Sequence, residues 1–360
     1  MSRSVAVGSP RASGHGAALV SAGGTRLRQR RRRRVVGIAV LLAVLVVACV
    51  LSVVIGAKTI PLQDVWAGLF APTGTENDLI IRELRVPRTI VGVLAGAALG
   101  LAGALMQGHT RNPIADPGIL GITQGAALAV VLAVYTFGVT TLLGFIWFGF
   151  AGALLGALAV FAIGSLGRGG PTPVTLALAG TAISHLLQAI TSALVISDQQ
   201  TMDTYRFWKV GSIAITDTAV IPQVLPFLVV GVVLALANAS SLNALSLGDD
   251  VARSLGHRVE WARRAGIAGI AILVGGAVAI CGPIGFVGLI VPHAARFFTG
   301  ADYRWLLPFA GLLGASLVLL ADVLGRIVAR PSEVQVGVML AMVGAPFFIA
   351  LVRRRKLVRL

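Results

Sequence analysis

The sequence predicts an all-α membrane protein with about ten transmembrane helices. Of its 360 residues, 56% are hydrophobic and only 12% are charged, and the mean hydropathy is +0.89. A soluble domain carries about 25% charged residues, so this chain cannot cover a surface that faces water. Runs of roughly 20 apolar residues, the length that crosses a bilayer, recur along the whole chain.

Residues 1–34 form a basic head before the first apolar run. Ser, Gly and Ala dominate its first 25 residues, and because such a composition cannot bury a core, we expect residues 1–34 to be disordered and cytoplasmic. The arginines could belong to a signal peptide. However, the apolar run 35–56 is too long for one and lacks a small-residue cleavage site. We therefore predict a retained first span.

Nine further apolar runs follow the first span. The run 285–298 is short, and Pro283 and Pro292 bend the chain around it. A broken or partly re-entrant helix is expected there, because irregular backbone survives at membrane depth only where protein covers it. The predicted spans are 35–56, 90–107, 118–136, 142–166, 173–196, 219–238, 264–281, 285–298, 305–325 and 334–352.

The distribution of positive charge predicts the orientation. With the N-terminus and the basic tail 353–360 inside, the cytoplasmic segments hold 22 of the 30 Lys and Arg residues. Such an excess is typical of cytoplasmic loops. The net charge of +16 also suggests nucleic-acid binding, but the charges lie at the ends of apolar runs and not on one face. We therefore predict lipid, and not nucleic acid, as the surroundings of this chain.

Several kinds of chemistry have no recognisable motif in this sequence. None of the three lysines lies in a phosphate-binding loop, and the five histidines form no catalytic triad or metal cluster. Cys49 and Cys281 lie inside apolar runs, which favours two buried thiols over a disulfide. We predict no catalytic residues, no cofactor and no metal site, so that a pump built on this chain must draw energy from another polypeptide.

The long polar loop 239–263 predicts two short helices separated by Gly248. Asp249 and Asp250 begin the second helix, where the helix dipole favours acids, and Gly256 is typical of a helix end. Such a hairpin either docks a soluble partner or simply lies at the membrane surface, and the spacing leaves both interpretations open. One apolar stripe is expected from Leu242, Leu245, Leu247, Val251 and Leu255.

A glycine-rich apolar helix begins after Arg85 and Arg88 and ends in a polar turn. Small residues let such helices pack closely in a bilayer. In the turn, Asn112 precedes Pro113 and Asp116 precedes Pro117. A residue before proline disfavours helix, so the first helix must stop there and a second one begin.

Two further motifs lie near the C-terminus. Gly285, Gly288 and Pro292 allow a tight bend against a neighbouring helix. His293 follows them as a candidate metal ligand or proton relay, although the lack of a second ligand nearby favours a structural role. Asp322 is an acid within an apolar helix, which suggests function, but Arg326 one turn later offers an ion pair, the interpretation we prefer.

These motifs, in this order, resemble the FecCD-type permease subunits of importers for iron-siderophores, haem and cobalamin. The resemblance covers about residues 58–352; the basic head departs from it, and the first span matches only in being apolar. It implies the type II ABC importer architecture, a multi-pass protein of the bacterial cell membrane with both termini cytoplasmic. It further implies a second permease subunit, two ATPase subunits and an extracytoplasmic substrate-binding protein.

The resemblance also assigns roles to residues. It implies that the ATPase-coupling element, residues 240–256, contains Leu247, Gly248, Asp249, Ala252, Leu255 and Gly256. It places Arg85, Arg88 and Arg326 in an external pocket for acidic side chains of the binding protein, and Thr172 and Pro173 beside a cytoplasmic gate. The expected cargo is a ferric siderophore, with haem and cobalamin as alternatives. The main rival function is a secondary transporter driven by an ion gradient; a nucleic-acid-binding or lipid-binding role for the basic head is the third.

Overall fold

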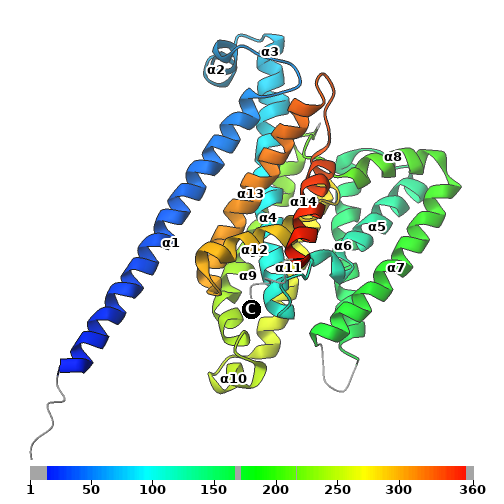
Figure 1. The fold of residues 1–360 in the computed structure, drawn as a ribbon. Coiled ribbons are helices and arrows are strands. Elements are labelled where there is room, and N and C mark those ends of the chain that lie inside the picture. Colours follow the sequence, from blue (N-terminus) through cyan, green and yellow to red (C-terminus); the bar gives the residue numbers. More distant parts are fainter. Residues whose placement is uncertain (1–13, 167–171, 216, 354–360) are drawn as a thin grey trace, which may run out of the picture.

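The structure is a computed structural model that describes residues 14–166, 172–215 and 217–353, and over these ranges the regular elements are all helices. Long helices stand side by side in Figure 1. The α10 end of the molecule carries α10 (Asp249–Ser254), and the opposite, α2 end carries α2 (Leu62–Phe70) and α3 (Glu76–Leu79). Seven of the described helices are long and apolar enough to cross a membrane.

Each of the ten predicted spans corresponds to a helix. The three that fall below the length of a full span are α5 (Ile122–Phe137), α12 (Val287–Thr299) and α14 (Val336–Arg353). The short α12 agrees with the broken helix expected at 285–298. The other seven are α1 (Gly14–Val54), α4 (Val86–Thr110), α6 (Leu142–Gly164), α7 (Pro173–Ser197), α9 (Val220–Leu245), α11 (Val259–Cys281) and α13 (Tyr303–Val328).

Helix α1 differs from the prediction because it begins at Gly14 and continues through the basic run. Residues 14–34 are therefore helical where disorder was expected, whereas residues 1–13 lie outside the described part. Arginine, leucine and alanine are good helix formers. A helix that already exists in the first span also extends without a new nucleation step.

The loops between spans contain short helices of their own. At the α2 end, α3 leads through a π-helical turn, Ile80–Arg85, into α4, and α8 (Gln199–Val210) follows α7. Asp198 caps α8 by accepting from the Thr201 amide at 2.7 Å. At the α10 end, α9 runs to Leu245, so the first of the two short helices predicted for 240–256 is in fact the last turns of α9.

Helix α4 runs through the middle of the bundle (Figure 1) and packs on α13 and α12 through small residues. A side-chain carbon added at Gly314 would overlap the backbone of Gly96, and one at Gly103 would overlap Gly288. Because lipid tails are as apolar as leucine, helices in a membrane are held by such close packing and not by burial from water.

This packing predicts opposite effects for two glycines of α13. Gly314→Ala is expected to destabilise the protein by about 1–3 kcal/mol, because the new methyl group overpacks the contact with Gly96. Gly311→Ala is the matched control, since its Cβ would lie 3.6 Å or more from Leu101, and alanine is the better helix former. Thermal unfolding of the two variants in detergent measures the difference, and equal midpoints would contradict the packing argument.

Candidate coupling and transport sites

The α10 end carries an exposed apolar surface, which we call the α10 patch and which consists of Leu247, Val251 and Leu255. Their exposed fractions are 64%, 44% and 61%, whereas Leu242 and Leu245 are buried. The single stripe of five residues predicted from the sequence is therefore wrong. Leu242 and Leu245 belong to the end of α9, which packs inside the bundle, and the chain leaves α9 for α10 at Gly248, whose φ of +114° suits glycine.

Asp249 holds α10 against two spans. Its carboxylate pairs with Arg111, which follows α4, and with Arg263 of α11 at 3.0 Å. Partial burial alone would raise the pKa of Asp249, but the guanidinium charges of Arg263 and Arg111 outweigh it and lower that pKa below its ordinary value. The attachment is therefore present at neutral pH and is lost only as the pH falls through this lowered pKa. Ala252 of α10 is completely buried.

The turn between α4 and α5 has the predicted local structure. The Asn112 side chain accepts from the Ile114 amide at 3.1 Å, and the Asp116 side chain accepts from the Gly118 amide at 2.8 Å. Pro117 packs against Gly288 at the start of α12. The turn therefore stops α4 and also supports the broken segment before α12.

The break between α11 and α12 is built differently from the prediction. The residues with left-handed backbone are Gly282 (φ +69°) and Phe286 (φ +68°), not Gly285. A bulky residue with positive φ is strained, and such strain persists where the surrounding packing imposes it. Pro292 lies inside α12, and His293 faces the ring of Phe347. Over the described ranges, no three His, Cys, Asp or Glu side chains form a group that could hold a metal ion.

A buried polar contact joins α4 to α12 near the break. Arg296 donates to the Gln107 side-chain oxygen, and the Gln107 amide nitrogen lies 3.3 Å from the carbonyl oxygens of Gly288 and Leu289. Sequence reasoning missed Gln107. A polar residue in a glycine-rich apolar helix was the available signal, but its partner lies 189 residues away.

The α2 end contains a buried ion network centred on Asp322. Its carboxylate pairs with Arg326 at 2.8 Å, which confirms the predicted i,i+4 pair, and also with Arg88 at 2.7 Å. Arg88 reaches further to Glu333 at 2.6 Å, whose side chain is 34% exposed. Two arginines and two carboxylates thus neutralise one another at the junction of α4 and α13.

The three arginines assigned to an external pocket have donors engaged inside the chain. Arg85 donates to the carbonyls of Val53, Val54 and Lys58, and Arg326 donates to those of Ser52 and Ile55. They thereby satisfy carbonyls in the last turn of α1, which have no helical partner, and in the residues that follow it. A cavity of about 310 Å³ lies beside Arg85, Arg88, Arg326 and Glu333. An acidic side chain that entered it would compete with the contacts already made.

A polar cavity of about 450 Å³ lies between α5, α7 and the break before α12. Its walls include Gln124 of α5, Thr181, Ser184 and His185 of α7, and Gly285. The Ser184 hydroxyl is buried without a partner. Sequence reasoning missed this polar face, although Thr181, His185, Gln188 and Ser192 recur at helical spacing.

Thr172 caps the N-terminus of α7, which begins at Pro173. The Thr172 hydroxyl accepts from the Thr175 amide at 3.2 Å. The polar cavity therefore lies along the helix that these two residues start. The preceding residues 167–171 lie outside the described part.

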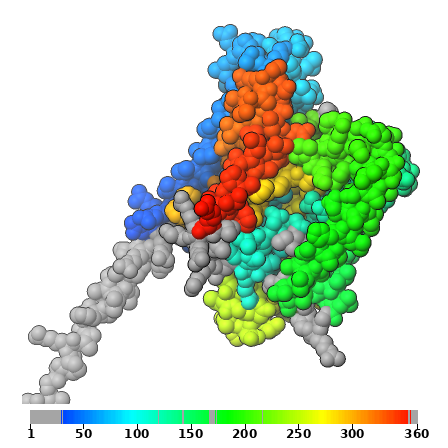
Figure 2. Space-filling view, turned by 45° about the vertical axis from the view of Figure 1, so that its right-hand side comes forward, coloured from blue at the N-terminus to red at the C-terminus, as the bar shows by residue number. Residues whose placement is uncertain are grey.

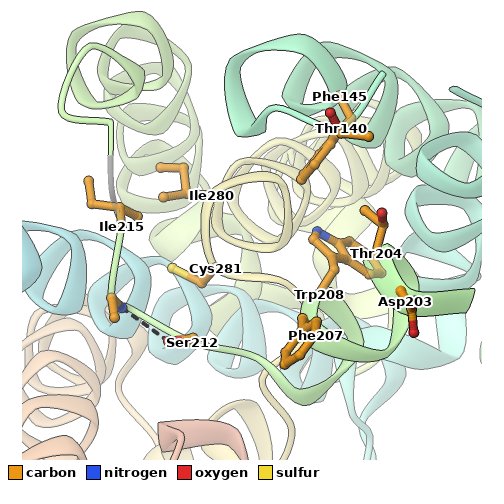
Figure 3. A pocket seen from close by; sticks show the side chains of 11 residues that line it. Thr140, Phe145, Asp203, Thr204, Phe207, Trp208, Ser212, Ile215, Ile280 and Cys281 are labelled. Carbon is orange, nitrogen blue, oxygen red and sulfur yellow. Dashed lines mark hydrogen bonds between the residues drawn. The ribbon is translucent and has the colours of Figure 1, made fainter. Parts of the chain in front are cut away.

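A third cavity, of about 540 Å³, lies beside α8 at the α2 end. Figure 3 shows Asp203, Thr204, Phe207 and Trp208 of α8 on one side, with Thr140 and Phe145 facing them. Ser212 and Cys281 close it near the start of the break. Three of its eleven lining residues are aromatic, and Asp203 supplies the one carboxylate.

A helical bundle of this hydrophobicity, with a broken central helix, polar cavities between its spans and an exposed patch at one end, is the membrane-spanning permease of a transporter. The chain belongs to the FecCD transport family, which matches residues 44–354. It is a permease of the ABC importer family whose members carry siderophores, haem and cobalamin.

Named relatives and a solved structure agree with this assignment. The ferric enterobactin permease FepD of Escherichia coli is 43% identical over 89% of this chain and 96% of its own length. The iron(3+)-hydroxamate permease FhuB of Bacillus subtilis is also 43% identical, over 88% of this chain and 83% of its own. An inward-facing structure of a metal-chelate type ABC transporter aligns with a TM-score of 0.77 and 29% identity, covering 90% of this chain and 100% of the other.

The ion network predicts a large effect for Asp322→Asn. Two buried arginines would lose their shared counter-ion, which costs about 3–5 kcal/mol and lowers the thermal midpoint by about 10 °C. Glu333→Gln is the control, because its partly exposed pair contributes about 1 kcal/mol or less. If both variants unfold at the same temperature in detergent, the network does not have the importance assigned to it.

The Asp249 attachment makes a second prediction with a neighbouring control. Asp249→Asn removes two pairs to other helices, so amide protection in α10 is expected to fall about three- to tenfold in hydrogen exchange. Asp250→Asn removes only the pair to Arg253 within α10, where the Asp250 side chain is fully exposed. Its protection should stay close to that of the parent protein. A similar loss in both variants would show that Asp249 does not anchor the helix.

Proposed function

We propose that this chain moves a ferric siderophore, or a related metal chelate such as haem or cobalamin, from an extracytoplasmic binding protein into the cytoplasm. Relatives named for ferric enterobactin, iron(3+)-hydroxamate, hemin and cobalamin support this cargo class. ATP hydrolysis takes place on two separate ATPase subunits. The observation that carries the proposal is the α10 patch, an apolar surface held rigidly at one end of the bundle.

The proposed orientation puts the α10 end and both termini in the cytoplasm. The arginine-rich part of α1 and the α10 loop then lie on the side that normally carries the excess of positive charge. The same orientation exposes α2, α3 and α8 to the outside, where a binding protein arrives.

The proposed coupling runs from the α10 patch into the spans through Asp249. A motor that moves α10 pulls on α4 through Arg111 and on α11 through Arg263. Helix α4 in turn packs closely on α12 and α13. Movement of the ATPase is therefore passed to the helices that border the break at Gly282–Phe286.

The proposed path for the chelate follows the polar face of α7. The lining of the cavity beside Thr181 and His185 is mostly uncharged, with Asp116 as its carboxylate, and such weak contacts suit a bulky solute that must be released again. Thr172 and Pro173 are proposed to lie near its gate. Helix α7, which lies in the green part of Figure 2, also has exposed apolar residues, such as Leu178 at 68% and Leu186 at 60%. A second permease subunit is proposed to cover part of this face.

Docking of the binding protein is proposed at the arginine-lined cavity of the α2 end. Glu333 is the partly exposed partner of Arg88, so an incoming carboxylate can replace it at the smallest cost. Arg85 and Arg326 remain bound to the carbonyls of α1 and fix the geometry.

The α10 patch provides the decisive test. The triple variant Leu247→Ser, Val251→Ser, Leu255→Ser should lose co-purification with the ATPase and at least 90% of uptake, because a docked apolar surface contributes about 25 cal/mol per Å². The assay compares labelled ferric chelates and cobalamin in vesicles. The fold of the triple variant should be unchanged, since the three replaced side chains are exposed.

The control for this test is Asp250→Ser with Arg253→Ser, which removes exposed polar groups from the same short helix. It should keep ATPase binding and uptake. Normal uptake by the triple variant would contradict the proposal. Uphill accumulation by the chain alone under a proton or sodium gradient would favour the rival secondary transporter.

A further inference from the structure

The run Arg31–Arg34 of α1 places four positive charges close together, with few acidic side chains near them. The sequence of α1 contains no acidic residue. Arg31, Arg32 and Arg33 are exposed, and among the described residues no carboxylate pairs with them. Among the α1 arginines whose side chains the structure describes, Arg34 has an acidic partner, Asp302, at 3.1 Å. The charges of Arg31, Arg32 and Arg33 are therefore available to an anion from outside the chain.

The arrangement of these arginines indicates what kind of anion surrounds them. Successive residues of a helix point 100° apart, so Arg31–Arg34 face in every direction around the axis. Arg34 pairs with Asp302 of the protein, whereas the other three are exposed. A protein partner would contact one face of the helix, whereas a layer of lipid headgroups surrounds the helix on all its free sides.

The level of the arginines matches a headgroup layer. The apolar part of α1 begins at Val35, and Val35 and Val36 are about half exposed. In the most apolar stretch of the candidate span Arg31–Val54, only 11% is buried inside the protein, which leaves most of its surface free to contact lipid. At 1.5 Å per residue, Arg31 lies about 6 Å beyond Val35, within a headgroup layer that is about 5–8 Å thick.

A second observation places the same level at the membrane interface. Arg34 donates to the Thr299 carbonyl at 2.7 Å, and its guanidinium lies 5.8 Å from the centre of the Trp305 ring. Next to Thr299, Phe297 and Phe298 are 84% and 62% exposed. Trp side chains gather where hydrocarbon meets headgroups, so Trp305 and the arginines mark one interface.

Asp302 fixes this level relative to the rest of the protein. Besides Arg34, its carboxylate accepts from the Asn243 side chain at 3.0 Å, and it caps the N-terminus of α13. Asn243 lies two residues before the end of α9, which leads into α10. Figure 1 shows that the basic end of α1 otherwise stands apart from the bundle, which leaves its outward sides free.

We propose that Arg31, Arg32 and Arg33 form a binding surface for anionic phospholipid headgroups, held at the membrane interface by the contacts of Arg34. The phosphate of phosphatidylglycerol supplies the negative charge, and the guanidinium fork suits its oxygens. The surface retains anionic lipid in preference to zwitterionic lipid. This inference concerns a part of the chain outside the matched residues 44–354 and does not depend on the transported solute.

The test measures which lipids stay bound to the purified full-length chain. The protein is incubated in mild detergent with equal amounts of phosphatidylglycerol and phosphatidylcholine, and bound lipids are counted by native mass spectrometry. The triple variant Arg31→Gln, Arg32→Gln, Arg33→Gln should lose the preference for phosphatidylglycerol at least tenfold. Each arginine near a membrane surface changes affinity about fivefold.

Two controls separate this surface from charge in general. Replacing the same three arginines by lysine keeps the charge and should keep most of the preference. The variant Arg82→Gln, Arg206→Gln, Lys209→Gln removes three cations at the α2 end and should leave the preference unchanged. An unchanged preference in the α1 glutamine variant, or an equal loss in the α2-end control, overturns the proposal.

The single variants keep the proposal testable if the triple variant does not insert into membranes. Arg31→Gln, Arg32→Gln and Arg33→Gln each leave the other arginines in place and should lower the preference about three- to fivefold. If none changes it, or if the parent chain loses a bound acidic protein but no lipid in 0.5 M salt, the surface belongs to a protein partner and the proposal is wrong.

Discussion

The close approach of α4 to α12 and α13 is the constraint on which the rest of the structure depends. Glycines at 96, 103, 288 and 314 bring the backbones together, and lipid offers no hydrophobic force that could replace this packing. The same helix carries Arg88 at one end and is followed by Arg111 at the other. The buried ion network and the attachment of α10 are therefore placed relative to each other by one central helix.

Charge inside the bundle is arranged so that little of it is left unbalanced. Arg88 and Arg326 share Asp322 and Glu333, and Arg85 lies against the carbonyl end of α1, where the helix dipole is negative. Both oxygens of the Asp322 carboxylate are paired with an arginine, one with Arg88 and the other with Arg326. Asp322 therefore favours a structural role, which weakens the case for an ion-driven carrier.

The sequence predicted what local chemistry determines. The lengths of the apolar runs predicted ten helices, and the prolines predicted that the one at α12 is short. The i,i+4 spacing of Asp322 and Arg326 predicted their ion pair. Contacts between distant residues were out of reach: Arg88 lies 234 positions from Asp322. The prediction of one apolar stripe in the α10 loop was wrong for a related reason. Whether Leu242 and Leu245 are buried depends on how α9 packs against the other helices. At the break, packing imposes positive φ on Phe286 although Gly285 is next to it.

The separation of buried and exposed groups in the α10 loop explains why a docking role suits it. Asp249 and Ala252 face inward and fix the helix, while Leu247, Val251 and Leu255 face outward. An apolar patch that served only folding would be covered by the chain itself, as Leu242 and Leu245 are. Rigid attachment to α4 and α11 adds a mechanical requirement: a force applied to the patch moves the spans instead of bending a loop. In the proposed function, the exposed patch provides the docking surface for the partner, and the Asp249 pairs pass its movement to α4 and α11.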